Sequence, residues 1–145
     1  MANDVLTFLQ AQQTAIAAIT ESAVIVFPRV HIAATVNIPA MLEAQRFPCV
    51  VLNDGGGSLD SHESVYWTRT FSATIIDVSS RDITGETVAS RVLALGELLT
   101  DALKYSVTNS IVLVEDGDLQ SVADEGGDSI VAWKTYSFSY TLKRD

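Results

Sequence analysis

Acidic and glycine residues between positions 53 and 63 form the segment with the clearest potential for chemistry. The segment carries side chains of the types that bind metal ions: Asp54, Asp60, His62 and Glu63. Carboxylates and imidazoles are suitable ligands for divalent metals, but their spacing here matches no known metal-site pattern. A solvated acidic loop is the simpler interpretation, and we expect neither a metal nor any other cofactor.

The glycine run Gly55-Gly56-Gly57-Ser58 in the same segment invites comparison with a phosphate-binding loop. In a P-loop a lysine follows the glycines and a helix begins there, and this sequence has neither feature. The run also differs from the GxGxxG pattern. Because glycine adopts backbone conformations that other residues avoid, we predict a flexible loop between two strands.

A second acidic segment, residues 116–128, invites comparison with a calcium-binding loop. Its acidic residues are Asp116, Asp118, Asp124, Glu125 and Asp128. If Asp116 were the first ligand of an EF-hand loop, Ser121 would replace the glycine at position six and Gly127 the glutamate at position twelve. No helix pattern flanks the segment, so we predict a long solvated loop.

Nucleophilic and acid–base catalysis find little support in the sequence. His31 and His62 are the available histidine bases, and no serine lies in a GxSxG motif. Cys49 is the single cysteine and lies in an apolar run, which predicts a buried core thiol. Asp77 is the carboxylate with the most apolar neighbours, and we interpret it as a turn residue near the end of a strand. These residues favour a protein that is not an enzyme.

The elements that would hold these residues follow from hydrophobic periodicity and turn signals. We predict helices over 4–19, 37–46 and 85–104, and strands over 24–30, 48–52, 65–78, 110–115 and 130–142. Helices that alternate with blocks of antiparallel strands indicate an α+β fold. We expect one domain over residues 1–145, with a single mixed, mainly antiparallel sheet and with the N-terminal helix and the long helix packed on one face.

The long helix and the last strand carry the clearest patterns. An apolar stripe at helical spacing is formed by Val88, Val92, Leu95, Leu99 and Leu103. Along residues 130–142 large apolar residues alternate with threonine and serine, which predicts one covered face and one wet face. Trp133 lies on the wet face and Trp67 lies in the strand 65–78, so both are candidate interface aromatics. Burial of both tryptophans in the core is the alternative.

Composition and charge narrow the function further. Of the 145 residues, 48% are hydrophobic and 19% are charged, which is typical of a folded globular protein. The net charge of −9 argues against a protein that grips nucleic-acid phosphates, although an acidic wall would let DNA slide past. The start of the chain lacks the basic region of a signal peptide, and we expect no membrane span.

Several phrases occur in a characteristic order after the amphipathic N-terminal helix. They are FPCVVLNDGGGS, IIDVSSRD, TGETVASRVLALGELLTDAL, IVLVEDGD and AWKTYSFSYTLKRD. In this order they resemble the tail terminator (tail-completion) proteins of long-tailed bacteriophages across essentially the whole chain. The residues that match the family pattern are Pro48, Val50, Val51, Val78, Ser80, Arg81 and Asp82. Residues 29–46 match nothing in that family, and the acidic segment 116–128 is longer than expected there.

The resemblance implies a structural virion protein that is assembled in the host cytoplasm. Six copies would form a ring that caps the tail tube, ends its polymerisation and joins the tail to the head connector or stopper protein. DNA would pass through the ring without specific binding. The tail tube protein would be a partner, as would the sheath in a contractile tail. Such a ring needs a head-to-tail interface on every subunit.

The acidic segments are the candidate assembly surfaces, together with Trp67 and Trp133. The candidate interface loops contain Asp54, Gly55, Gly56, Asp60, His62, Glu63, Asp116, Asp118, Asp124 and Asp128. One alternative is another neck component (a head–tail stopper or adaptor) or a tail tube subunit, and another is a small metal- or ligand-binding module. The stripe from Val88 to Leu103 argues against a tube subunit, because tube subunits usually have a barrel-like core with fewer helices.

Overall fold

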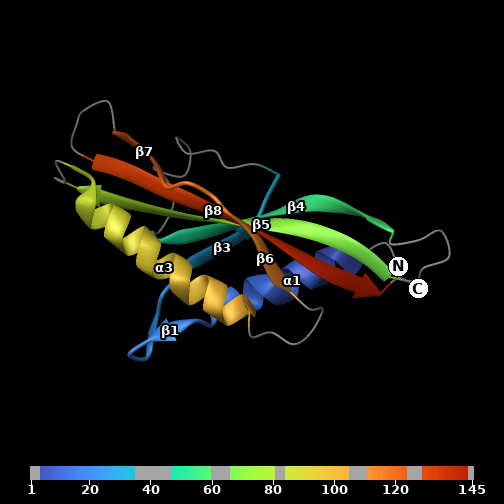
Figure 1. The fold of residues 1–145 in the computed structure, drawn as a ribbon. Helices are drawn as coiled ribbons and strands as arrows, with labels where there is room; N and C mark the ends of the chain where they lie inside the picture. The colour runs from blue at the N-terminus through green and yellow to red at the C-terminus, as the bar shows by residue number, and fades with distance from the viewer. Residues whose placement is uncertain are drawn as a thin grey trace.

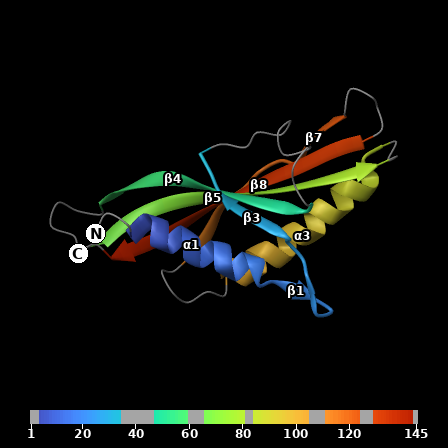
Figure 2. The same cartoon turned by 180° about the vertical axis from the view of Figure 1, so that it is seen from behind.

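The computed structural model describes residues 4–34, 47–59, 66–80, 84–104, 111–123 and 129–143. In this part of the chain, helices α1 (Asp4–Ala17) and α3 (Glu86–Lys104) lie on the same face of one sheet (Figures 1 and 2). The sheet is mixed and mainly antiparallel, so the predicted α+β class is confirmed. The helix predicted over 37–46 lies outside the described residues.

The main sheet has six strands in the order β3-β4-β5-β8-β6, and β7 pairs with β8 beside β6. Its strands are β3 (Arg29–Ile32), β4 (Cys49–Leu59), β5 (Tyr66–Ser80), β6 (Val112–Asp116), β7 (Gln120–Ala123) and β8 (Ser129–Lys143). β3 and β4 are parallel, and the other pairs are antiparallel. A separate hairpin of β1 (Thr20–Glu21) and β2 (Val24–Ile25) projects beside α3.

The main core lies between the two helices and the sheet. Its helical side chains include Phe8, Leu9, Ile16, Val88, Val92, Leu99 and Leu103. Phe8 of α1 stacks on Tyr140 of β8 with ring centroids 3.7 Å apart, and Phe71 of β5 stacks on Phe138 of β8 at 5.1 Å. Stacked rings of this kind add to the free energy gained from buried apolar area. The predicted stripe of α3 and the predicted covered face of β8 are thus both found in the core.

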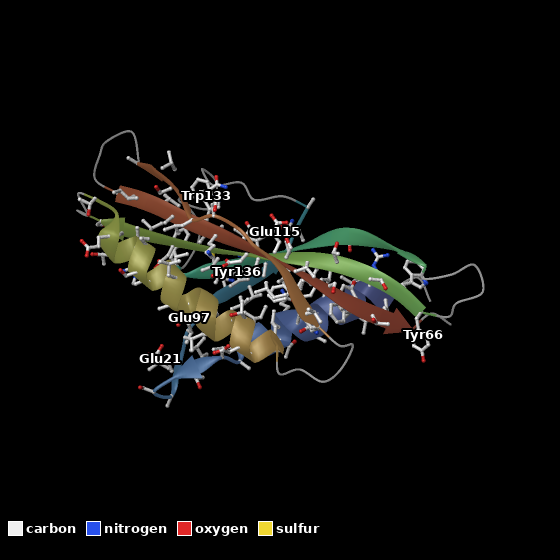
Figure 3. All side chains as sticks on the ribbon, in the orientation of Figure 1. Glu21, Tyr66, Glu97, Glu115, Trp133 and Tyr136 are labelled. Atoms are coloured by element: carbon white, nitrogen blue, oxygen red, sulfur yellow. The ribbon has the colours of Figure 1, made fainter. Side chains whose placement is uncertain are left out.

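A smaller apolar cluster lies on the opposite face of the sheet. Its fully buried members are Cys49, Val51, Ile76 and Val131. Trp133 is half-buried and packs against this cluster, pointing away from the helices in Figure 3. The face that the sequence predicts to be wet is therefore partly apolar at one end of the sheet. The cause is that β4, β5 and β8 each place at least one large side chain there.

The glycine run is part of a strand, so the predicted flexible loop is wrong. β4 continues through Gly55, Gly56 and Gly57, with a bulge between Asp54 and Gly56. Gly56 has a φ of 77°, a left-handed conformation that favours glycine. A side chain at Gly55 would collide with the Thr70 hydroxyl of β5. The glycines therefore serve the close approach of the bulged strand to β5, and the ladder continues beyond them.

Two further segments differ from expectation. The predicted strand 24–30 is split into β2 and β3, and the division lies at Phe27 and Pro28, because proline cannot donate a ladder hydrogen bond. The acidic segment 116–128, predicted as a loop, contributes Asp116 to β6 and residues 120–123 to β7. Both strands pair with β8. β6 corresponds to the predicted strand 110–115, whereas β7 was not predicted.

Candidate functional site

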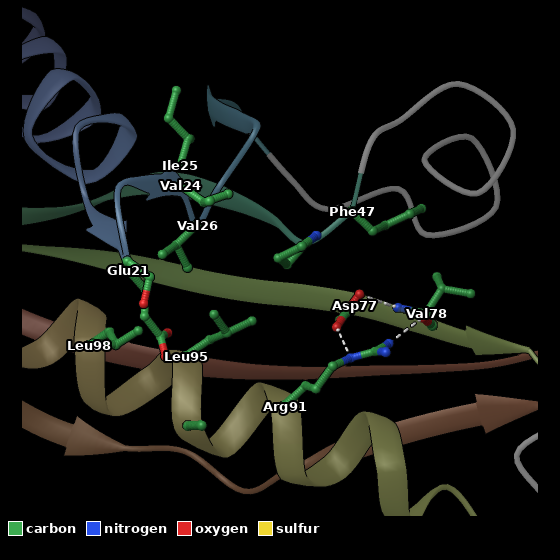
Figure 4. Close-up of a pocket in the computed structure, with 13 residues that line it drawn as sticks. Glu21, Val24, Ile25, Val26, Phe47, Asp77, Val78, Arg91, Leu95 and Leu98 are labelled. Atoms are coloured by element: carbon green, nitrogen blue, oxygen red, sulfur yellow. Dashed lines mark hydrogen bonds and ion pairs between the residues drawn. The ribbon is translucent and has the colours of Figure 1, made fainter.

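A buried ion pair links the sheet to the long helix. Asp77 is 3% exposed and lies inside β5, so its interpretation as a turn residue is wrong. Arg91 of α3 donates from Nε to Asp77 Oδ2 at 2.8 Å and from Nη2 to the Val78 carbonyl at 2.6 Å (Figure 4). The backbone N–H of Val78 donates to Asp77 Oδ1 at 2.8 Å. Both carboxylate oxygens are therefore occupied, which does not suit a general base.

This ion pair lies on the wall of a groove of about 730 Å³. The groove runs between the β1–β2 hairpin, the end of β5 and one side of α3 (Figure 4). Its walls are mostly apolar and include Val24, Val26, Leu95 and Leu98, with Glu21 at the hairpin. The Arg91 side chain is 47% exposed but is paired with Asp77, so the charged part of the groove is an ion pair with Glu21 nearby. A mostly apolar groove with a few charged groups is typical of a binding site.

The single thiol, that of Cys49, is in an environment that makes it unreactive. Cys49 is fully buried, and burial together with the negative charge of Asp77 raises its pKa to about 12. A thiol with so high a pKa holds almost no thiolate at neutral pH and is a poor nucleophile. The sequence-based interpretation of Cys49 as a core residue is confirmed.

Asp54 and Trp67, two of the predicted interface residues, both contact Arg69 at the other end of the sheet. Arg69 donates from Nη2 to both carboxylate oxygens of Asp54 at 3.1 Å. Its guanidinium also lies 5.1 Å from the centre of the half-buried Trp67 ring. Burial lowers the pKa of Arg69, but the interactions with Asp54 and Tyr140 together outweigh burial and raise the pKa above its usual value. Asp54 thus neutralises a buried cation.

The second acidic segment lies on the opposite edge of the sheet. Asp116 is exposed, and its Oδ1 forms an ion pair with Nζ of the buried Lys134 of β8 at 2.8 Å. Asp118 is exposed on the chain between β6 and β7. The structure therefore separates Asp54 from Asp116 and Asp118 rather than gathering them into one site. Asp60, His62, Glu63, Asp124 and Asp128 lie outside the described residues.

The hairpin carries the first of two exposed apolar patches. Val24 is 67% exposed and Ile25 is 59% exposed, and we call these two residues the hairpin patch. The two turn residues, Ser22 and Ala23, have φ values of 51° and 66°. Positive φ at both central residues is costly for residues other than glycine, asparagine or aspartate. The hairpin thus combines a strained turn with large apolar side chains in solvent.

The second patch lies at the edge of the sheet. We define the edge patch as Val112, Leu113 and Val114 of β6 with Val122 of β7, which are 41% to 56% exposed. All five residues of β6 are exposed, and its outer side pairs with no other strand among the described residues. Figure 1 shows α3 between the hairpin and β6. The sequence shows these apolar residues but not their exposure, because apolar runs in strands are usually buried.

In comparisons with known proteins, no family model and no curated protein sequence matches this chain. Across the described residues there is no group of three or more histidine, cysteine or acidic side chains arranged to hold a metal ion. No helix in the same part of the chain has the length and apolar character needed to cross a membrane.

Proposed function

We propose that this chain is a structural subunit that assembles into a ring and acts as a tail terminator of a long-tailed bacteriophage. The observation that carries the proposal is the presence of two separate exposed apolar patches, the hairpin patch and the edge patch. Monomeric proteins rarely expose large contiguous apolar patches, and exposed patches often mark interaction sites. Two different patches on one chain suit a head-to-tail contact, which closes into a ring when the rotation allows it.

The proposal takes the specific role from the sequence resemblance and the assembly mode from the surface. In this role the ring caps the tail tube, stops its growth and offers its other face to the head connector or stopper. The protein has no catalytic part in it, in keeping with a quiet thiol and a fully engaged Asp77. The net charge of −9 suits a passage that DNA crosses without binding.

The proposal is tested by polymerising the tail tube protein of the same virus with and without this chain. We expect shorter tubes with a ring at one end in negative-stain electron micrographs. The Val114→Lys variant should lose capping, because a lysine at a 56% exposed edge residue disrupts an apolar contact but not the core. The matched control Leu93→Lys changes a 45% exposed residue of α3 outside both patches and should cap normally. Tubes of unchanged length with bare ends would refute the role.

A further inference from the structure

We propose that the contact between subunits is a strand addition, in which β6 of one copy docks along β2 of the next copy and over the adjoining groove. This inference rests on the proposed ring and specifies how the ring closes. The occupant of the hairpin groove is thus a second copy of this chain, and the segment that fills it is Val112–Asp116.

Within the part of the chain that the structure describes, the hairpin has no third strand. β1 and β2 pair over only two positions, Thr20 with Ile25 and Glu21 with Val24. An isolated two-stranded hairpin is marginal in water, and a third strand is usually needed for stability. Here the strained turn at Ser22 and Ala23 lowers the stability further. A strand added along β2 would supply the missing ladder and cover Val24 and Ile25.

β6 is the matching half of the contact. It is an edge strand with three consecutive exposed apolar residues, Val112 to Val114, and such an edge readily pairs with another chain. Strand addition gives affinity through main-chain hydrogen bonds and specificity through side-chain pockets. The groove beside β2 offers such a pocket, with apolar walls from the hairpin and from Leu95 and Leu98 of α3.

Charge sets the direction of the added strand. β6 ends in Glu115 and Asp116, and Asp118 follows; all three are exposed. At the base of the hairpin, Arg29 is exposed at the start of β3. Glu21 lies at the turn end of the hairpin.

A β6 strand parallel to β2 places its apolar half against Val24 and Ile25 and its acidic half near Arg29. The antiparallel arrangement would instead bring Glu115 close to Glu21. Complementary charges fix orientation and register in this way at protein interfaces. The parallel arrangement is therefore the one that we propose.

A charge exchange tests this contact in the full chain. Arg29→Glu and Glu115→Arg should each raise the concentration needed for ring formation by about tenfold, and the double variant should restore it. The control Asp101→Arg changes an exposed acidic residue of α3 and should leave ring formation unchanged. Melting temperatures of all variants show whether each one is folded.

Cross-linking gives the second readout. The double variant Val24→Cys/Val112→Cys should form disulfide-linked ladders up to the size of the ring, and each single variant should not. Cys49 adds no background, because it is buried and its pKa is about 12. A linked dimer from Val112→Cys alone would mean that β6 pairs with itself, and this would overturn the inference.

The two proposals fail in distinguishable ways. A ring that forms without the cross-link, and without rescue in the charge-exchange double variant, refutes the strand addition but leaves the ring intact. A wild-type chain that stays monomeric at every concentration, alone and with tail tubes, refutes both.

Discussion

Three buried or half-buried cations hold the sheet's polar groups in place. Arg69 pairs with Asp54 at 3.1 Å, Arg91 with Asp77 at 2.8 Å and Lys134 with Asp116 at 2.8 Å. In each pair one side chain is largely buried, so its partner removes the large cost of an isolated interior charge. In a chain with nine basic and eighteen acidic residues, these pairs use a third of the cations.

None of these pairs could be predicted from the sequence. The partners are 14 to 18 positions apart and on different elements, so no local spacing connects them. The role of Asp77 could be predicted only from its neighbours in the sequence, and a carboxylate near a strand end usually belongs to a turn. By contrast, the apolar run around Cys49 was sufficient to predict burial, because burial depends on local composition more than on a specific partner.

The thiol of Cys49 makes stability depend on alkaline pH. Its folded pKa of about 12 lies above the ordinary thiol value of 9.0, so the stabilising contribution is complete below pH 9 and is lost as pH rises towards 12. Between pH 9 and 11 this loss amounts to about 2 kcal/mol. Cys49→Ala should be less stable at pH 7, because it leaves a cavity, but should lose less stability between pH 9 and 11.

Urea unfolding at pH 7, 9 and 11, followed by tryptophan fluorescence, measures the free energy of unfolding of both proteins. Tyrosine ionisation acts on both alike and therefore cancels in the comparison. Equal pH dependence in Cys49→Ala and the wild type would contradict the buried-thiol account.

At the scale of elements, long periodic segments were predictable, and strands of two to four residues were not. The apolar stripe of α3 and the alternation of β8 each extend over more than ten residues, so the periodic pattern outweighs local exceptions. β1, β2 and β7 are two to four residues long and are mostly polar or exposed, which leaves no period to detect. The hairpin patch lies on such short strands. β6 was predicted as a strand, but its exposure was not, so the sequence predicted the fold better than the proposed assembly surfaces.

The contact between α3 and β8 depends on a glycine within the helix. A side chain at Gly96 would collide with the hydroxyl of Tyr136, which is 5% exposed. Gly96→Ala should therefore destabilise the protein by roughly 1–3 kcal/mol, although alanine favours a helix by about 1 kcal/mol. The exposed control Ser90→Ala should be neutral or slightly stabilising.

Thermal unfolding compares these variants. Because the collision begins at the Tyr136 hydroxyl, Gly96→Ala combined with Tyr136→Phe should be less destabilised than the sum of the two single changes. A Gly96→Ala protein as stable as Ser90→Ala would show that α3 does not lie this close to the sheet.

At the scale of the whole molecule, no described helix covers the β6 edge of the sheet or the hairpin. The main core fills the space between the helices and the sheet, while β6 and the hairpin project apolar side chains into solvent on either side of α3. Natural sheet edges are usually shortened, charged or covered, and β6 combines two acidic residues with an uncovered apolar run. In the ring that we propose, a neighbouring copy would cover both of these surfaces.

The most direct test of this account is the molar mass of the purified protein by light scattering over a range of concentrations. The account predicts a closed ring: the mass rises from 15.6 kDa to six times that value and then stays constant. A plateau is the mark of ring closure, since an open head-to-tail chain would continue to grow with concentration. A mass of 15.6 kDa at every concentration, alone and with isolated tail tubes, would contradict it.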